Sequence, residues 1–228
     1  MDEIQKLIVD AKAQWRNLWR SLFLLYLPIL LLFIGVGILS RVVEGASLQF
    51  FLRDVTATGG LPFFAGFVSQ LGMILWSASL TICLFGWLVL SRRTGDPVPS
   101  RSFLLHAGIL TGMLLVDDIF LFHEEIAPNY LHINEKFVVA AYVAMGIYFV
   151  ASNWREILSS EYLILFLALA LFGLSIFVDA LPIRDFNIRY FWELLGVFLE
   201  DGFKFMGIAT WLVYFARYAY HKLVSVAR

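Results

Sequence analysis

Six long runs of apolar residues follow one another along the chain, separated by more polar connections. A helix needs about 20 predominantly apolar residues to cross the hydrocarbon core of a bilayer, and the runs are close to that length. The pattern therefore predicts an all-α, polytopic integral membrane protein with six transmembrane helices. The predicted spans are residues 21–40, 67–90, 102–122, 137–153, 161–180 and 192–218.

The first 20 residues carry apolar side chains at helical spacing rather than in one run. Ile4, Leu7, Ile8, Ala11 and Trp15 share one helical face, and the basic residues lie away from its centre. This pattern is typical of a helix lying in the headgroup region, with a partner-binding helix as the alternative. The sequence thus predicts an interfacial amphipathic helix at 1–20, a transmembrane domain at 21–218 and a cytoplasmic tail at 219–228.

Composition supports the membrane class and excludes other classes. The chain is 61% hydrophobic and 15% charged, which lies outside the range of soluble globular domains. A net charge of -1 without a basic run excludes a nucleic-acid binder. The first apolar run is longer than the hydrophobic region of a signal peptide, so we expect it to remain as an anchor. The single cysteine, Cys83, has no partner for an internal disulfide.

The distribution of basic residues predicts the orientation. With six spans both termini lie on one side, and that side carries 11 of the 17 lysines and arginines against five on the other. Because basic residues are enriched in cytoplasmic loops, both termini are expected in the cytoplasm.

The last predicted span contains charged residues at membrane depth: Glu200, Asp201 and Lys204, with Glu193 at its start. Each costs about 2.5–3.5 kcal/mol near the centre of a spanning helix, so we expect partners or a function for them. Glu200 precedes Lys204 by four residues, which is the favourable order for an ion pair within one helix. Lys204 is therefore interpreted as a counter-charge.

The end of the third predicted span carries a second group of titratable residues. Asp117 and Asp118 lie inside the span, and His123 and Glu124 follow it. Asp117 and Glu124 are seven residues apart, so they are expected to share one helical face. The third span runs outward and the last runs inward, so the two groups are expected to meet in the outer half of the membrane. The sequence predicts a site that faces the extracytoplasmic side.

The surplus of acids over bases points to cation or proton binding as the leading hypothesis. Clustered carboxylates in a medium of low dielectric constant do not all stay ionised, so some bind protons or a cation. A transporter or channel would use such a site. The candidate ligands are Asp117, Asp118, His123, Glu124, Glu200 and Asp201. A carboxylate-rich set suits a divalent metal ion such as Mg²⁺, Mn²⁺ or Ca²⁺ better than zinc.

Three alternatives remain open at this stage. The same residues can hold a metal that activates water against a lipid, which would make the protein a metal-dependent lipid-modifying enzyme. Lys204 can instead neutralise one or two acids in a purely structural ion pair. A non-catalytic subunit of a membrane complex, or a homo-oligomer, would also use the apolar, aromatic-rich fourth and fifth spans. The expected partners are the lipid bilayer and a small cation or proton.

Overall fold

The computed structural model describes residues 3–43, 51–92, 98–180 and 189–225, and every regular element within these ranges is helical. The predicted all-α class is therefore confirmed. The chain divides into two units, Met1–Ala65 and Gly66–Arg228, and each is described by itself.

Among its described residues, the first unit has a long helix, α1 (Glu3–Val42), and a short helix, α3 (Val55–Gly59). Residues 3–42 form a single helix through Pro28, rather than an interfacial helix followed by a separate span. At 1.5 Å per residue α1 is about 60 Å long, about twice the thickness of a hydrocarbon core. Only its second half, Leu22–Val42, has the composition of a membrane span. The side chains of residues 6–17 lie outside the described part of the structure, so the interfacial location of 1–20 stays a prediction.

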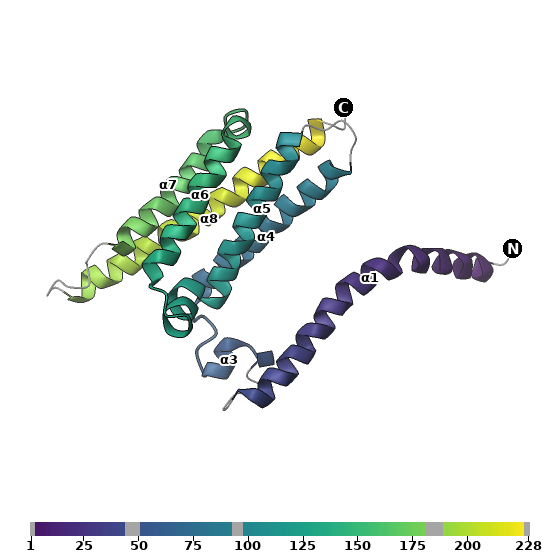
Figure 1. The fold of residues 1–228 in the computed structure, drawn as a ribbon, viewed down its shortest axis with the longest axis horizontal. Coiled ribbons are helices and arrows are strands. Elements are labelled where there is room, and N and C mark those ends of the chain that lie inside the picture. Colours follow the sequence, from purple (N-terminus) through teal and green to yellow (C-terminus); the bar gives the residue numbers. More distant parts are fainter. Residues whose placement is uncertain (1–2, 44–50, 93–97, 181–188, 226–228) are drawn as a thin grey trace. The chain divides into compact units, whose positions relative to one another are not determined.

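The second unit is a bundle of long helices, and each predicted span after the first corresponds to one of them (Figure 1). The predicted ends differ from the helix ends in places: α5 ends at Phe120, two residues before its predicted end, and α7 begins at Tyr162. The helix α4 packs on α5 and on α8, α7 packs along α8, and α6 packs on α5. A π-helical segment, η1, connects α5 to α6 and contacts both. The elements are α4 (Phe67–Ser91), α5 (Val98–Phe120), η1 (Phe122–Tyr130), α6 (Glu135–Leu158), α7 (Tyr162–Ala180) and α8 (Arg189–Ser225).

Aromatic side chains fill the core of this bundle. Phe103 of α5 stacks on Phe149 of α6 at 5.5 Å between ring centroids and meets the edge of Tyr218 of α8 at 4.8 Å. The ring centroids of Trp211 and Phe215 of α8 lie 4.9 Å apart, and both side chains are fully buried. Such ring pairs add about 0.5–1.5 kcal/mol each beyond their buried area. They fix α5, α6 and α8 against one another and so fix the backbone that carries the charged residues.

A partly buried carboxylate, Glu156 of α6, ties the same three helices together near their other end. Its Oε1 accepts a hydrogen bond from Ser100 Oγ at 2.9 Å and one from Tyr218 OH, and it pairs with Lys222 Nζ at 2.6 Å. Because every partner comes from the protein, this cluster is satisfied as a structural ion-pair network.

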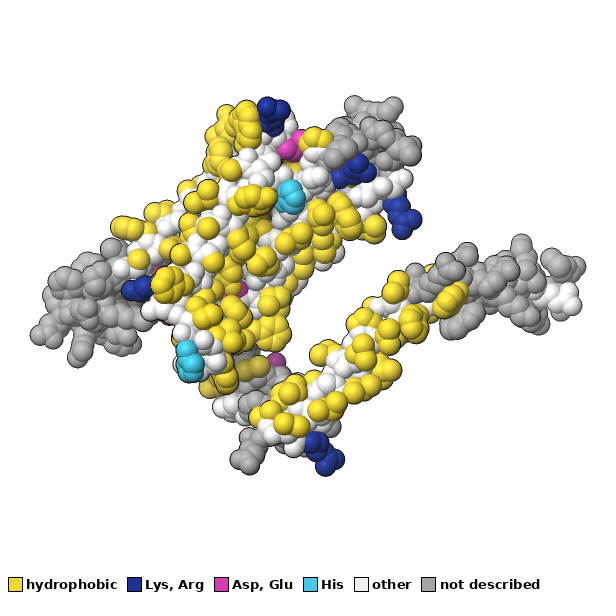
Figure 2. All heavy atoms as spheres, in the orientation of Figure 1, with side chains coloured by type: hydrophobic (Ala, Val, Ile, Leu, Met, Phe, Trp, Pro, Cys, Tyr) yellow, Lys and Arg dark blue, Asp and Glu magenta, His cyan; other side chains and the backbone are white. Residues whose placement is uncertain are grey.

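The outside of the helices is apolar along its length. Phe85, Ile109 and Ile147 are more than half exposed, and Figure 2 shows apolar side chains over the helix sides with Lys and Arg near helix ends. Among the described residues, five helices are long and apolar enough to cross a membrane, in α1, α4, α5, α6 and α7. The described part of α8 is not among them, because Glu200, Asp201 and Lys204 lower its hydropathy. The sixth span therefore stays a prediction.

Candidate functional site

The end of α5 turns sharply, and this turn builds one half of the site. Leu121 has a left-handed backbone (φ 51°), after which residues 122–130 continue as the π-helix η1. A leucine rarely adopts this conformation, because its side chain crowds the backbone. The expectation that Asp117 and Glu124 share a face of one continuous helix is therefore wrong. The left-handed residue ends the regular helix at Phe120 and folds the chain back toward Asp117.

Asp117 is the anchor of this turn. Its Oδ2 lies 2.6 Å from His123 Nδ1, and its Oδ1 accepts the backbone N–H of His123 at 3.0 Å and the hydroxyl of Tyr142 at 2.9 Å. The Asp117 side chain is only about 5% exposed. A buried carboxylate needs such donors to offset the loss of water. The three bonds fix the plane of the His123 ring and leave Nε2 as its other polar atom, 3.5 Å from Glu124 Oε1.

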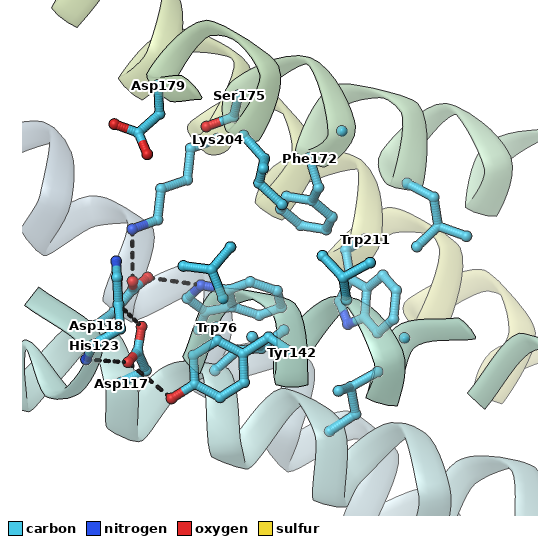
Figure 3. A pocket seen from close by; sticks show the side chains of 18 of the residues that line it. Trp76, Asp117, Asp118, His123, Tyr142, Phe172, Ser175, Asp179, Lys204 and Trp211 are labelled. Atoms are coloured by element: carbon cyan, nitrogen blue, oxygen red, sulfur yellow. Dashed lines mark hydrogen bonds and ion pairs between the residues drawn. The ribbon is translucent and has the colours of Figure 1, made fainter. Parts of the chain in front are cut away.

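The second half of the site is an ion pair between helices. Lys204 Nζ of α8 lies 2.7 Å from Asp118 Oδ1 of α5, and Trp76 Nε1 of α4 donates to Asp118 Oδ2 at 2.9 Å. Lys204 was predicted to be a counter-charge. Its described ion-pair partner, Asp118, lies on another helix rather than within α8. Figure 3 shows Lys204 extending from α8 to meet Asp118 beside His123.

These residues form the polar end of a cavity of about 620 Å³. Glu124, Glu200 and Asp201 line the same cavity, so the structure brings together all seven charged residues that the sequence singled out. One further acid, Asp179, also lines it. The remainder of the cavity is apolar and extends along Trp76 and Phe172 toward Trp211 (Figure 3). A volume of this size lies within the range of ligand pockets.

Three aromatic residues from three helices form one wall of the apolar part. Trp76 of α4 stacks on Phe172 of α7 with ring centroids 5.6 Å apart, and Trp211 of α8 lies within 6.2 Å of both rings. Trp211 is held by a hydrogen bond from its Nε1 to Thr111 Oγ1 at 3.0 Å. Because Trp76 also binds Asp118, one side chain joins the polar and apolar ends of the cavity.

Within the described residues, no three His, Cys, Asp or Glu side chains are arranged to hold a metal ion. The two central carboxylates direct their oxygens at protein donors, Asp117 at His123 and Tyr142, and Asp118 at Lys204 and Trp76. The predicted divalent metal ion has no preformed ligand set there and stays a prediction.

A comparison of the sequence with protein families gives one match, which covers residues 22–218 and is described as a domain of unknown function, DUF8692. The chain belongs to the DUF8692 family. No curated protein and no solved structure is similar to it at a significant level.

Four residues of the DUF8692 site were not predicted from the sequence: Trp76, Tyr142, Ser175 and Asp179. Asp179 is an acid in an otherwise apolar span, which is itself a signal in the sequence. Trp76 and Tyr142 look like ordinary membrane aromatics in the sequence. Only the packing of α4 and α6 against α5 turns their polar atoms toward Asp118 and Asp117.

His123 lies beyond the end of the apolar span Pro99–Phe120. The hydrogen bond to Asp117 raises the pKa of His123 above its ordinary value near 6.5, against the opposing effect of partial burial. A protonated His123 and Lys204 are the two cationic side chains at the polar end of the DUF8692 cavity.

Proposed function

We propose that the polar end of the cavity binds a cation, and that the protein works as a membrane-embedded binding or transport protein for it. One observation carries this proposal. Six carboxylates line the cavity, against one lysine and one histidine. In a medium of low dielectric constant such an excess of negative charge attracts a cation or protons.

Lys204 and His123 would serve as internal cations that hold the site together when it is empty. Lys204 is paired with Asp118, and His123 with Asp117, so both acids have a partner before a ligand arrives. An external cation would then bind chiefly to the other acids that line the cavity near these two ion pairs: Glu124, Asp179 and Asp201. Lys204 would keep the affinity moderate by repulsion, as release by a transporter requires.

The direction of access follows from the proposed topology. If both termini are cytoplasmic, as the positive-inside rule favours, the ends of α5 and α8 that carry Asp118 and Lys204 lie in the outer half of the bilayer. The cavity would then fill from the extracytoplasmic side.

Thermal unfolding of the purified protein tests cation binding directly. A cation that binds the folded state raises the melting temperature, by an amount equivalent to about 2.7 kcal/mol at 100 times its Kd. We expect stabilisation by one or more of sodium, calcium, magnesium, manganese and ethylammonium chlorides at constant ionic strength. The effect should weaken in Asp201→Asn and Glu124→Gln and persist in Glu125→Gln, the neighbouring acid that bonds Asn129 instead. Identical curves in every salt would reject the proposal.

A metal-dependent lipid-modifying enzyme is the second candidate, favoured by a different observation. The apolar part of the cavity reaches the Asp117–His123 pair, and Asp117 fixes the ring so that His123 Nε2 can exchange a proton. Elemental mass spectrometry on wild type and an Asp118→Asn, Glu200→Gln double variant tests it. A stoichiometric metal in wild type that is lost in the variant would favour the enzyme.

A further inference from the structure

We propose that the cation is the primary ammonium group of a single-chain amphiphile, whose apolar chain occupies the rest of the cavity. The ligand class is therefore a long-chain amine, and it enters from the bilayer between α6 and α7. This inference rests on the proposed cation-binding function and specifies its ligand.

The shape of the cavity requires an apolar portion in the ligand. The cavity follows α8 from Glu200 to Trp211, which at 1.5 Å per residue is about 16 Å. That distance is about half the thickness of a hydrocarbon core, so it matches the chain of a lipid from one leaflet. An inorganic ion would occupy only the acidic end and would leave the apolar part of the cavity unfilled.

The charge of the cavity selects the head group. Even with His123 protonated, the acids that line it outnumber the cations by six to two. Lys204 is already paired with Asp118, so a phosphate or carboxylate head would meet mostly like charge. An ammonium head meets acids, and the ring of Tyr142 lies at the same end of the cavity (Figure 3). Aromatic faces attract ammonium groups when both are desolvated.

A buried hydroxyl gives independent evidence for a polar ligand group. Ser175 of α7 is only about 7% exposed and lines the cavity one helical turn from Asp179. Its hydroxyl has no hydrogen-bond partner among the residues that the structure describes, unlike the helical serines Ser77 and Ser79. A buried hydroxyl without a partner costs free energy, and an N–H group of a primary ammonium would satisfy it.

The gap between α6 and α7 provides the entrance. α6 packs on α5 and η1, whereas α7 packs on α8, and the two do not pack closely on each other. Val143 and Ile147 of α6 and Ile176 of α7 line the cavity and are still 42%, 65% and 41% exposed. A Cβ added at Gly146 or at Gly173, on the same two helices, would lie in open space. These residues therefore border both the cavity and the lipid.

The test uses the full-length protein in nanodiscs of zwitterionic lipid. Tetradecylamine is compared with ethylamine, tetradecanol and tetradecyl sulfate by thermal unfolding and by native mass spectrometry. We expect tetradecylamine to stabilise the protein at a concentration on the order of tenfold or more below that of ethylamine, since its chain is buried. Tetradecanol and the sulfate should have little effect. Ser175→Ala should weaken the effect of tetradecylamine.

Two variants test the entrance. Gly173→Trp fills the α6/α7 gap and should abolish stabilisation by tetradecylamine while leaving that by ethylamine. Gly202→Trp is the matched control, because Gly202 of α8 also has open space around it but does not line the cavity. If Gly173→Trp does not fold, Gly146→Leu narrows the gap from α6.

The outcomes separate the two proposals. Equal potency of ethylamine and tetradecylamine would overturn this inference and leave cation binding standing. No stabilisation by any amine or metal salt would overturn both. Preference for the sulfate or the alcohol would overturn the ammonium head. A wild-type response to tetradecylamine in Gly173→Trp, or in Gly146→Leu where that replaces it, would overturn the route between α6 and α7.

Discussion

Lys204 Nζ lies 2.7 Å from Asp118 Oδ1, and this contact joins α8 to α5 at the polar end of the cavity. The Asp118 side chain is about 11% exposed, and Trp76 binds its second oxygen. The pair is therefore part of the site's architecture as well as its charge.

A double-mutant cycle measures this pair. Lys204→Met and Asp118→Asn should each lower the melting temperature, because each leaves the partner charge partly buried and unpaired. The stability lost in the double variant should be smaller than the sum of the losses in the two single variants. The difference is the coupling energy, expected to be about 0.5–3 kcal/mol. Glu161 and Arg217, an exposed ion pair of the same bundle, form the control cycle and should show a weaker coupling, because water screens exposed charges. Additive losses at Lys204 and Asp118 would mean that their contact contributes nothing to stability.

The His123–Asp117 pair predicts a pH-dependent stability. The pKa of His123 is raised in the folded protein, so the folded state binds this proton more tightly than the unfolded chain. The resulting stabilisation is present in full below about pH 6.5 and is lost as the pH rises through the raised pKa. Melting curves between about pH 6 and pH 9 measure it. His123→Asn should flatten this dependence.

The matched control for that measurement is His132→Asn. His132 is exposed and has a positive φ of 57°, a conformation that asparagine tolerates. This variant should keep the wild-type pH profile. A profile that changes equally in both variants would show that His123 is not the group responsible.

Gly207 of α8 controls how closely α7 approaches. A Cβ at this position would lie 2.7 Å from the ring of Phe172, which stacks on Trp76 and lines the cavity. Gly207→Ala should destabilise the protein by about 1–3 kcal/mol through overpacking, and it should weaken ligand binding by displacing Phe172. Gly202→Ala, on the same helix with open space around it, should do neither. Thermal unfolding and the amine titration measure the two effects.

Glu156 predicts a stability effect far from the cavity. Glu156→Gln removes the charge that pairs with Lys222 and weakens the bonds from Ser100 and Tyr218. We expect a loss of about 1–3 kcal/mol in the free energy of unfolding, with amine binding at saturation unchanged. Glu135→Gln, at the exposed start of the same helix, should cost much less. Loss of amine binding in Glu156→Gln would indicate that the two ends of the bundle are coupled.

The sequence alone determined the class of the protein and the location of its chemistry along the chain. Length and apolarity of each run are local properties, so they predicted helices α4 to α8 and identified the charged groups of α5 and α8 as unusual. The structure places these two charged groups along one cavity.

Tertiary structure decided which of these charges meet. Helical spacing within α8 favoured Glu200 as the ion-pair partner of Lys204. The packing of α4, α5 and α8 instead places Asp118 beside the Lys204 amine. The left-handed backbone at Leu121 returns His123 to Asp117, and no periodicity in the sequence encodes that turn. The cavity exists because α6 and α7 pack on different neighbours, and contacts between distant segments are set by helix crossing rather than by local pattern.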